Sequence, residues 1–134
     1  MISGFEVHTR AQAQMVDVTE EVRRALRAAK ATDGMCVVFV PHTTAGVTIQ
    51  ENADPDVQRD LLAALSRAVP DEPPGGYRHG EGNSPAHVKA SLVGSSATVL
   101  VEGGEPVLGT WQGIYLCEFD GPRTRRVQVR FLRG

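Results

Sequence analysis

Three of the four histidines stand beside small or polar residues that could take part in chemistry. His42 ends an apolar run and is followed by Thr43 and Thr44, whose hydroxyls are small hydrogen-bond donors. His79 and His87 lie eight residues apart in a polar segment. An imidazole can ligate a metal or exchange a proton near neutral pH, and catalytic zinc takes three protein ligands and leaves one position open. The pattern points to a metal or anion site at the three histidines, although histidines in polar loops are usually just solvated.

A carboxylate follows the first of these motifs at the end of a strand-like run. If the strands on either side of the His42 turn form a hairpin, Glu51 lies close to His42. Glu51 could then act as a general base or orient a ligating histidine. The alternative is a carboxylate that only marks the entry to the next helix.

The C-terminal third carries a second group of polar residues. Trp111 and Gln112 lie between small residues, where a ring or a phosphate could approach closely. Glu118 and Asp120 share a strand face with Gln112 because side chains alternate with a period of two. Paired carboxylates can hold a divalent cation or serve as acid and base, whereas the alternative is the wet face of a hairpin.

Five arginines fall within residues 123–133. Arg123 stands in a predicted turn, where its guanidinium could clamp a phosphate. Clusters of this kind are otherwise solvated strand faces or interfacial ion pairs.

Two further residue types give weaker signals. His8 is predicted to be an outward-facing strand residue, and Cys36 and Cys117 are predicted to be buried, reduced thiols.

The elements that must position these residues can be read from periodicity and from capping signals. Strands are predicted over residues 4–10, 13–18, 35–41, 47–52, 96–102, 110–120 and 125–132. The run 35–41 is apolar and β-branched, which is typical of a central strand buried on both faces. The first two strands suit a hairpin, and the last two are joined by a short turn at residues 121–124.

Three helices are predicted between these strands. The first is capped by Asp17 and ends near Gly34, the second begins at Asp54-Pro55, and the third runs from Ser84-Pro85 toward Gly94. The loop 70–83 is long and rich in Pro and Gly, which favours a functional or mobile segment. We therefore expect a single α+β domain spanning residues 1–134, with about three helices and a largely antiparallel or mixed sheet.

Length and composition exclude several classes of protein. The 134 residues carry 14 basic and 16 acidic side chains, a net charge of −2, which argues against nucleic-acid binding. No apolar run approaches the roughly 18 residues that span a bilayer, and no secretory signal is visible. The expectation is a cytoplasmic protein with no nucleic-acid or membrane partner.

The ordered set of motifs resembles the YjbQ-like family. The resemblance rests on the following segments, read in chain order: 17–19, 42–49, 51–52, Tyr77, His79, 82–83, 86–87, 92–94, 108–114 and 118–123. Members of this family are commonly labelled secondary thiamine-phosphate synthase enzymes, although the label describes a side capacity. The resemblance implies an α+β fold and a homotrimer. It also implies joining of a thiazole phosphate to a pyrimidine diphosphate, with release of diphosphate.

On this reading the site residues divide into three groups. The candidate catalytic residues are Glu51, His42 and Asn83, the candidate substrate and phosphate ligands are Thr43, Thr44, Trp111, Gln112 and Arg123, and the candidate metal ligands are His42, His79 and His87. The expected cofactor is a divalent ion, zinc or magnesium, that neutralises the leaving diphosphate. The expected partner is a small phosphorylated metabolite. Two alternatives stay open: a metal-dependent hydrolase of such a metabolite, and a non-catalytic trimeric protein that binds one.

Overall fold

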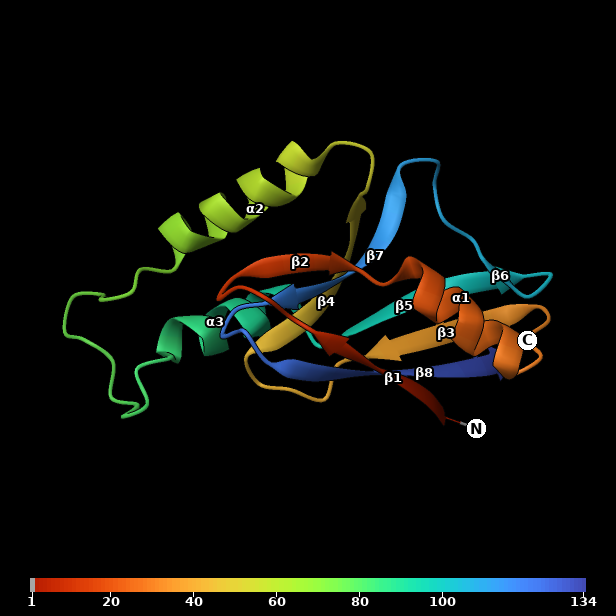
Figure 1. The fold of residues 1–134 in the computed structure, drawn as a ribbon, viewed down its shortest axis with the longest axis horizontal. Coiled ribbons are helices and arrows are strands. Elements are labelled where there is room, and N and C mark those ends of the chain that lie inside the picture. Colours follow the sequence, from red (N-terminus) through yellow and green to blue (C-terminus); the bar gives the residue numbers. More distant parts are fainter. Residues whose placement is uncertain (1) are drawn as a thin grey trace.

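Two antiparallel sheets form the centre of the molecule (Figure 1), which is a computed structural model describing residues 2–134. The five-stranded sheet has the order β1 (Ile2–His8), β8 (Thr124–Arg133), β3 (Gly34–Phe39), β5 (Ser96–Glu102), β6 (Glu105–Pro106). The three-stranded sheet has the order β2 (Gln14–Asp17), β7 (Gln112–Glu118), β4 (Ala45–Glu51). The helices are α1 (Thr19–Ala28), α2 (Pro55–Ala68) and α3 (Ser84–Val93). The predicted α+β class is confirmed.

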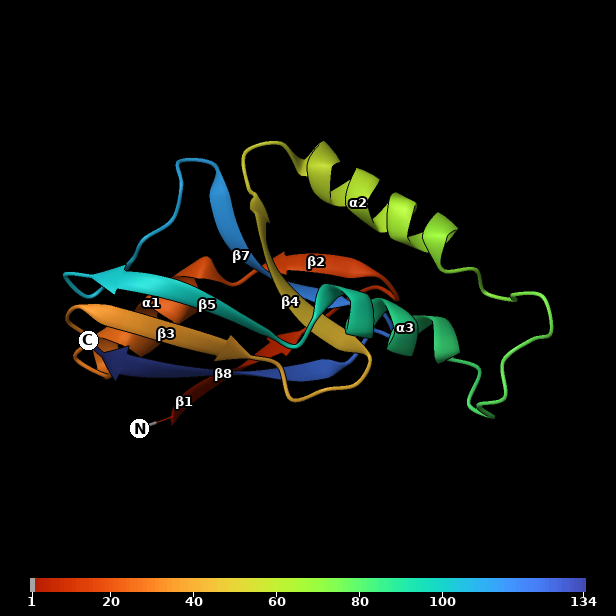
Figure 2. The same cartoon turned by 180° about the vertical axis from the view of Figure 1, so that it is seen from behind.

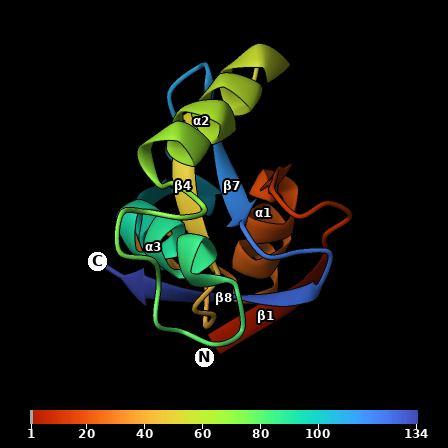
Figure 3. The same cartoon turned by 90° about the vertical axis from the view of Figure 1, so that its left-hand side faces the viewer.

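The main core lies between the two sheets. Buried valines of β3, β5 and β8 meet Ile114 and Leu116 of β7, and Val22 and Leu26 of α1 complete the cluster. A smaller cluster on the other face of the three-stranded sheet joins Cys117 and Phe119 to α3 and α2. Figure 3 shows β4 and β7 between α1 on one side and α2 and α3 on the other. The central strand β7 is therefore buried on both faces.

The same burial was predicted for the run 35–41, and there the prediction is wrong. The strand is central, because β3 pairs with both β5 and β8. Cys36 and Val38 are buried, but Met35 and Phe39 point the other way and are 41% and 40% exposed. Figure 2 shows this outer face of β5, β3 and β8 with α1 on the far side. No helix of the described chain covers it.

Each helix begins at a polar signal, close to the position predicted. Asp17 accepts hydrogen bonds from the backbone N–H and the hydroxyl of Thr19, one residue earlier than a true cap would stand. Asp54 caps α2 by accepting from the Asp56 N–H at 2.9 Å. The first helix ends at Ala28 and Lys30 takes the positive φ of 54°, so the predicted end near Gly34 is wrong. No residue of α2 is fully buried.

The predicted hairpins are absent from the described residues, because most consecutive strands belong to different sheets. The chain passes from β1 to β2, from β3 to β4 and from β7 to β8 by crossing between sheets. The register of the three-stranded sheet pairs Ala45 with Glu118 at one end and Glu51 with Gln112 at the other. The connections that follow β1, β3 and β7 meet at the Glu118 end of β7, where Gly121 N donates to Gln12 O and Phe119 N donates to Thr44 O. The candidate site lies at this end.

No helix among the described residues is long and apolar enough to cross a membrane.

Candidate functional site

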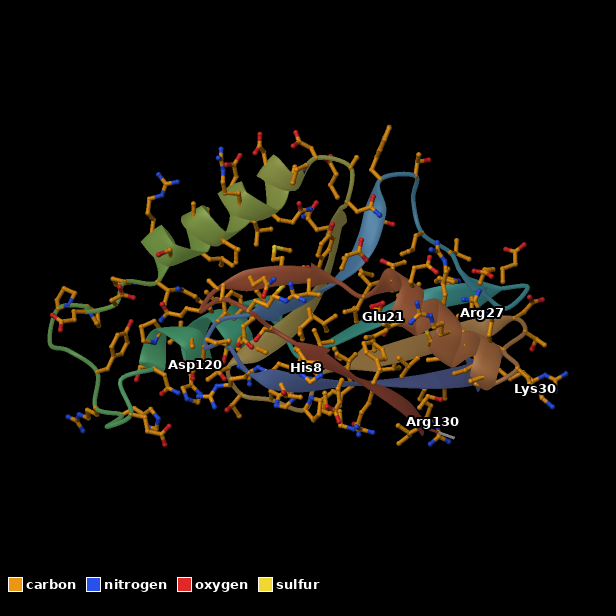
Figure 4. All side chains as sticks on the ribbon, viewed as in Figure 1. His8, Glu21, Arg27, Lys30, Asp120 and Arg130 are labelled. Atoms are coloured by element: carbon orange, nitrogen blue, oxygen red, sulfur yellow. The ribbon has the colours of Figure 1, made fainter. Side chains whose placement is uncertain are left out.

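Three segments meet at the end of β7. The first is the loop from β3 to β4, which carries His42 to Thr44, and the second is the turn after Glu118. The third is the end of loop 70–83 and the first turn of α3. Figure 4 shows Asp120, of the second segment, beside α3, while Arg27 and Lys30 lie at the opposite end of the molecule.

A hollow of about 400 Å³ lies between these segments, beside a second hollow that shares His42, Thr43 and His87 with it. Its size falls in the range of small-molecule sites, about 300–1,000 Å³. We call it the histidine pocket, and it is lined by Pro41, His42, Thr43, Thr44, His79, Glu81, Asn83, His87, Asp120, Arg123 and Arg125. The structure therefore brings together the three predicted histidines, both threonines, Asn83 and Arg123.

His42 is held by the backbone of the neighbouring strand β8. Its Nε2 accepts the Arg126 backbone N–H at 2.8 Å. A neutral ring that accepts at Nε2 carries its proton on Nδ1. Burial and the Arg125 charge lower the pKa of His42 below its ordinary value, and they outweigh the Glu118 charge, which acts to raise it. As arranged, His42 is a neutral imidazole whose Nδ1–H can donate.

The other two histidines lie against one another. The ring centroids of His79 and His87 are 5.2 Å apart and the rings are nearly perpendicular, at 85°. Glu81 stands beside them, with 3.8 Å between its Oε2 and Nε2 of His79. His87 is placed by the first turn of α3, where its backbone N–H donates to Asn83 O at 3.3 Å.

Asp120 organises the turn that follows β7. One of its oxygens, Oδ2, accepts from Asn83 Nδ2 and from Arg123 Nη2, both at 2.9 Å. Burial raises the pKa of Asp120, but these hydrogen bonds and the charges of Arg123 and Arg125 outweigh burial and leave the pKa below its usual range. Asn83 Oδ1 is buried and has no hydrogen-bond partner within the described chain. It is an acceptor that a water or a ligand donor can satisfy.

Beneath the pocket lies a buried ion pair that sequence reasoning missed. Arg125 Nε donates to Glu118 Oε1 at 2.8 Å and its Nη2 to Glu118 Oε2, and the two residues are 4% and 0% exposed. Arg125 Nη2 also donates to Thr44 Oγ1 at 2.8 Å, so the predicted phosphate ligand Thr44 is already engaged. The alternation of side chains along β8 could have revealed that Arg125 is buried, because Arg125 shares a strand face with the apolar Val127 and Val129.

A metal held by three histidines does not fit this arrangement. Metal ligation needs the lone pair of a ring nitrogen, but the Nε2 lone pair of His42 is taken by the Arg126 amide. Among residues 2–134, no group of three His, Cys, Asp or Glu side chains is placed to hold an ion. Glu118 has no free oxygen either, since Thr9, Asp120 and Arg125 all donate to it. The divalent cofactor stays a prediction.

The remaining predicted residues lie at the other end of the three-stranded sheet. Glu51 pairs with Gln112, and Trp111 is 64% exposed in the adjoining loop. Six strand positions at about 3.3 Å each separate Glu51 from Ala45, which is roughly 20 Å. Glu51 therefore cannot be the general base beside His42 within one chain. That expectation assumed a hairpin between β3 and β4, which belong to different sheets.

Known proteins share this sequence and this fold. Over residues 3–134 the chain matches the family described as UPF0047 protein YjbQ-like. It is 47% identical to UPF0047 protein YugU of Bacillus subtilis, covering 98% of this chain and 99% of that protein. It is 46% identical to UPF0047 protein MJ1081 of Methanocaldococcus jannaschii, covering 98% and 94%.

Solved structures agree along the same length. An uncharacterised YjbQ/UPF0047 family protein of Clostridium acetobutylicum superposes with a TM-score of 0.93 at 51% identity, covering 97% of this chain and 99% of that one. A protein of unknown function from Sulfolobus solfataricus gives 0.92 at 28% identity, covering 100% and 97%. The family match runs from residue 3 to residue 134 and so includes every residue of the histidine pocket. The chain is a member of the YjbQ-like UPF0047 family.

Proposed function

We propose that the histidine pocket binds the phosphate group of a small metabolite. The observation that carries this proposal is the convergence of His42, His79, His87 and Arg123 on one hollow from three separate segments. Arg123 uses Nε and Nη2 on Asp120, and its Nη1 has no partner within the described chain. A guanidinium with a free edge is a good phosphate ligand, and the hydroxyl of Thr43 and the Nδ1–H of His42 are further donors.

The reaction proposed for this pocket is transfer of the thiamine-phosphate synthase type. A thiazole nitrogen forms a C–N bond to the methylene carbon of a pyrimidine diphosphate. The C–O bond to diphosphate breaks, and its electron pair leaves with the diphosphate. Because the nitrogen attacks with its own lone pair, the step needs no general base, and the distance of Glu51 does not count against it. The protein's task is to stabilise the charge of the departing diphosphate.

Exposure of the pocket favours a second candidate, hydrolysis of a phosphate ester. The side chains of His79 and Arg123 are 44% and 53% exposed. Water therefore reaches the groups that would hold the phosphate. In the hydrolysis water would attack the phosphorus atom, the P–O ester bond would break, and inorganic phosphate and an alcohol would be released. Closure of the pocket by a second copy of the chain would favour transfer over hydrolysis.

The proposed assembly is the homotrimer that the family resemblance implies. Its support is an uncovered apolar row across the five-stranded sheet. Met35 lies in register between Leu100 and Leu132, and the three side chains are 41%, 63% and 42% exposed. Trp111 can serve the histidine pocket only if it comes from another copy. Light scattering should report three chains, and Met35→Glu should dissociate them.

The test of the reaction is product formation from the two precursors. Purified protein is incubated with the thiazole phosphate and the pyrimidine diphosphate, with added zinc or magnesium and, separately, with a chelator. We expect thiamine phosphate and diphosphate to appear in equal amounts. His87→Ala should lower the rate about tenfold or more. The matched control is His8→Ala, because His8 lies outside the pocket and bonds Thr124.

Two results would contradict the proposal. Wild-type protein that forms no thiamine phosphate under any of these conditions overturns the transfer. Release of inorganic phosphate from a phosphate ester, with the same dependence on His87, would then establish the hydrolase instead. Equal rates for the His87 and His8 variants would remove the pocket from either reaction.

A further inference from the structure

We propose that Arg125 is the buried anchor of the ligand's anionic group and that Glu118 positions it. This inference rests on the proposed binding of a phosphate in the histidine pocket. Arg125 is 4% exposed, yet it lines the pocket. It differs from Arg123, whose side chain is 53% exposed in the turn.

The hydrogen bonds of the guanidinium leave one edge free. Nε and Nη2 donate to the two carboxylate oxygens of Glu118, and Nη2 also donates to the Thr44 backbone oxygen at 3.2 Å and to its hydroxyl at 2.8 Å. Nη1 carries two further N–H donors, for which the described chain offers no partner. An unpartnered Nη1 could be either sealed inside the protein or open to solvent. Among the described side chains, the only polar atom that is sealed and unpartnered is Asn83 Oδ1, so Nη1 is not sealed. Nη1 therefore borders open space, and the histidine pocket is the open space that Arg125 lines.

The carboxylate of Glu118 is fully committed to holding this geometry. Oε1 accepts from Thr9 Oγ1 at 2.7 Å as well as from Arg125, and Oε2 accepts from the Asp120 backbone N–H at 3.0 Å. Glu118 thus accepts four hydrogen bonds, two from Arg125 and one each from Thr9 and Asp120. It sits at the last position of β7, paired with both Ala45 and Gln14, so the backbone beneath it is rigid. Glu118 is a positioning residue and does not itself face a ligand.

Breaking a buried ion pair is costly, but replacing both partners by well-packed apolar side chains of similar volume is often neutral or stabilising, so stability alone does not explain why such a pair is kept. Its retention at the floor of a pocket suits a different task. A guanidinium that is already desolvated and fixed loses little freedom when it binds an oxyanion. The ligand class that fits is a phosphate or diphosphate ester small enough for the pocket, with one oxygen on Arg125 Nη1 and another on Arg123.

The experiment measures binding of inorganic phosphate and inorganic pyrophosphate by isothermal titration calorimetry. The test protein is Glu118→Gln combined with Arg125→Gln, which removes both charges and leaves the net charge of the protein unchanged. We expect its pyrophosphate affinity to be at least about tenfold weaker than wild type, the usual scale for losing a charge-assisted hydrogen bond. Arg130→Gln is the matched control. Arg130 is exposed on the same strand, far from Asp120 (Figure 4), and its loss should change the affinity by less than about twofold.

A spectroscopic readout separates ligand binding from a purely structural role. In wild-type protein, the ¹⁵N signals of the Arg125 guanidinium should shift as pyrophosphate is added, which a structural ion pair would not do. Unchanged Arg125 signals, or unchanged affinity in the double variant, would overturn the inference. If Arg123→Gln still weakened binding in that case, the proposed function would stand without it. Absence of any phosphate or pyrophosphate binding to wild type would overturn both.

Discussion

Replacing Glu118 by Gln should destabilise the protein severely, although the two side chains have the same shape. Glu118 is 0% exposed and its two oxygens accept four hydrogen bonds, two at each oxygen. A glutamine keeps one oxygen, so its amide NH₂ must face two donors. Each buried donor left unpaired costs about 1–3 kcal/mol. The Arg125 charge also loses its counter-ion, and breaking a buried pair costs about 3–5 kcal/mol in all.

Urea unfolding at pH 7, followed by circular dichroism at fixed protein concentration, measures this loss. With a denaturant slope of about 1–3 kcal/mol per molar urea, the midpoint should fall by at least about 1 M. The control is Glu102→Gln, an exposed glutamate at the end of β5, which should shift the stability by less than about 0.5 kcal/mol. A loss below about 1 kcal/mol for Glu118→Gln would refute the reasoning that the pair is buried and fully bonded.

The same variant makes a prediction about pH. Burial raises the pKa of Glu118, but hydrogen bonds from Arg125, Asp120 and Thr9 and the Arg125 charge bring it below its ordinary value of 4.5. In that acidic range the unfolded chain binds a proton that the folded protein does not. Stability is therefore present above about pH 4.5 and is lost as the pH falls through the lower, folded pKa. In the Glu118→Gln variant, this part of the dependence of the free energy of unfolding on pH should be absent. Parallel curves of unfolding free energy against pH for the two proteins would contradict the prediction.

Three further predictions follow from single positions. Gly121→Ala should lower the stability by about 1–3 kcal/mol in thermal unfolding, because a Cβ there would lie 2.3 Å from the Ala11 backbone oxygen. Cys117 is buried and its pKa is raised to about 12, so a thiol reagent at pH 8 should modify it only at the rate of unfolding; rapid modification of the native protein would disprove its burial. The folded pKa of His42 lies below 6.5, so stability should fall as the pH drops from about 6.5 to that pKa. His42→Gln should remove this part of the slope in urea unfolding, and an unchanged slope would contradict it.

The local elements were predictable because their signals are local. Asp54 caps α2 with Pro55 behind it, as predicted. The third helix begins at Ser84-Pro85, but its N-cap is Asn83, so the start was predicted correctly and the capping residue was not. The loop 70–83 has neither periodicity nor strand formers, and it contains no helix or strand. The α+β class follows from counting these elements and needs no knowledge of how the strands pair.

Strand pairing was not predictable, because it depends on contacts far apart in sequence. Sequence reasoning joined β3 to β4 as neighbours along the chain, but β3 pairs with β5 and β8, and β4 pairs with β7. The one feature that could have revealed two sheets is that both faces of β7 are buried, each against a different core. The error then carried into the site, since it placed Glu51 beside His42.

The motif residues that converge could be named from the sequence, whereas their partners could not. The three histidines were predicted to hold a metal and Arg123 to hold a phosphate, and all four side chains line one pocket. The bond from the Arg126 amide to His42 is invisible in a sequence, because every residue but proline has the same N–H. It nevertheless decides which ring nitrogen is free, and so whether His42 can ligate a metal.

The charges beneath the pocket tie the stability of the fold to the chemistry of the site. Glu118 and Asp120 each form an ion pair with an arginine that borders the pocket. Both carboxylates therefore hold guanidinium groups in place, and neither is free to bind a metal ion. An incoming phosphate therefore meets guanidinium groups whose own charges are already balanced. The phosphate therefore gains hydrogen-bond donors in fixed positions and little net electrostatic attraction. Such a site selects its ligand by geometry and does little to steer it from a distance. On this basis, raising the salt concentration should weaken phosphate binding only modestly, and a steep dependence measured by calorimetry would show that steering dominates.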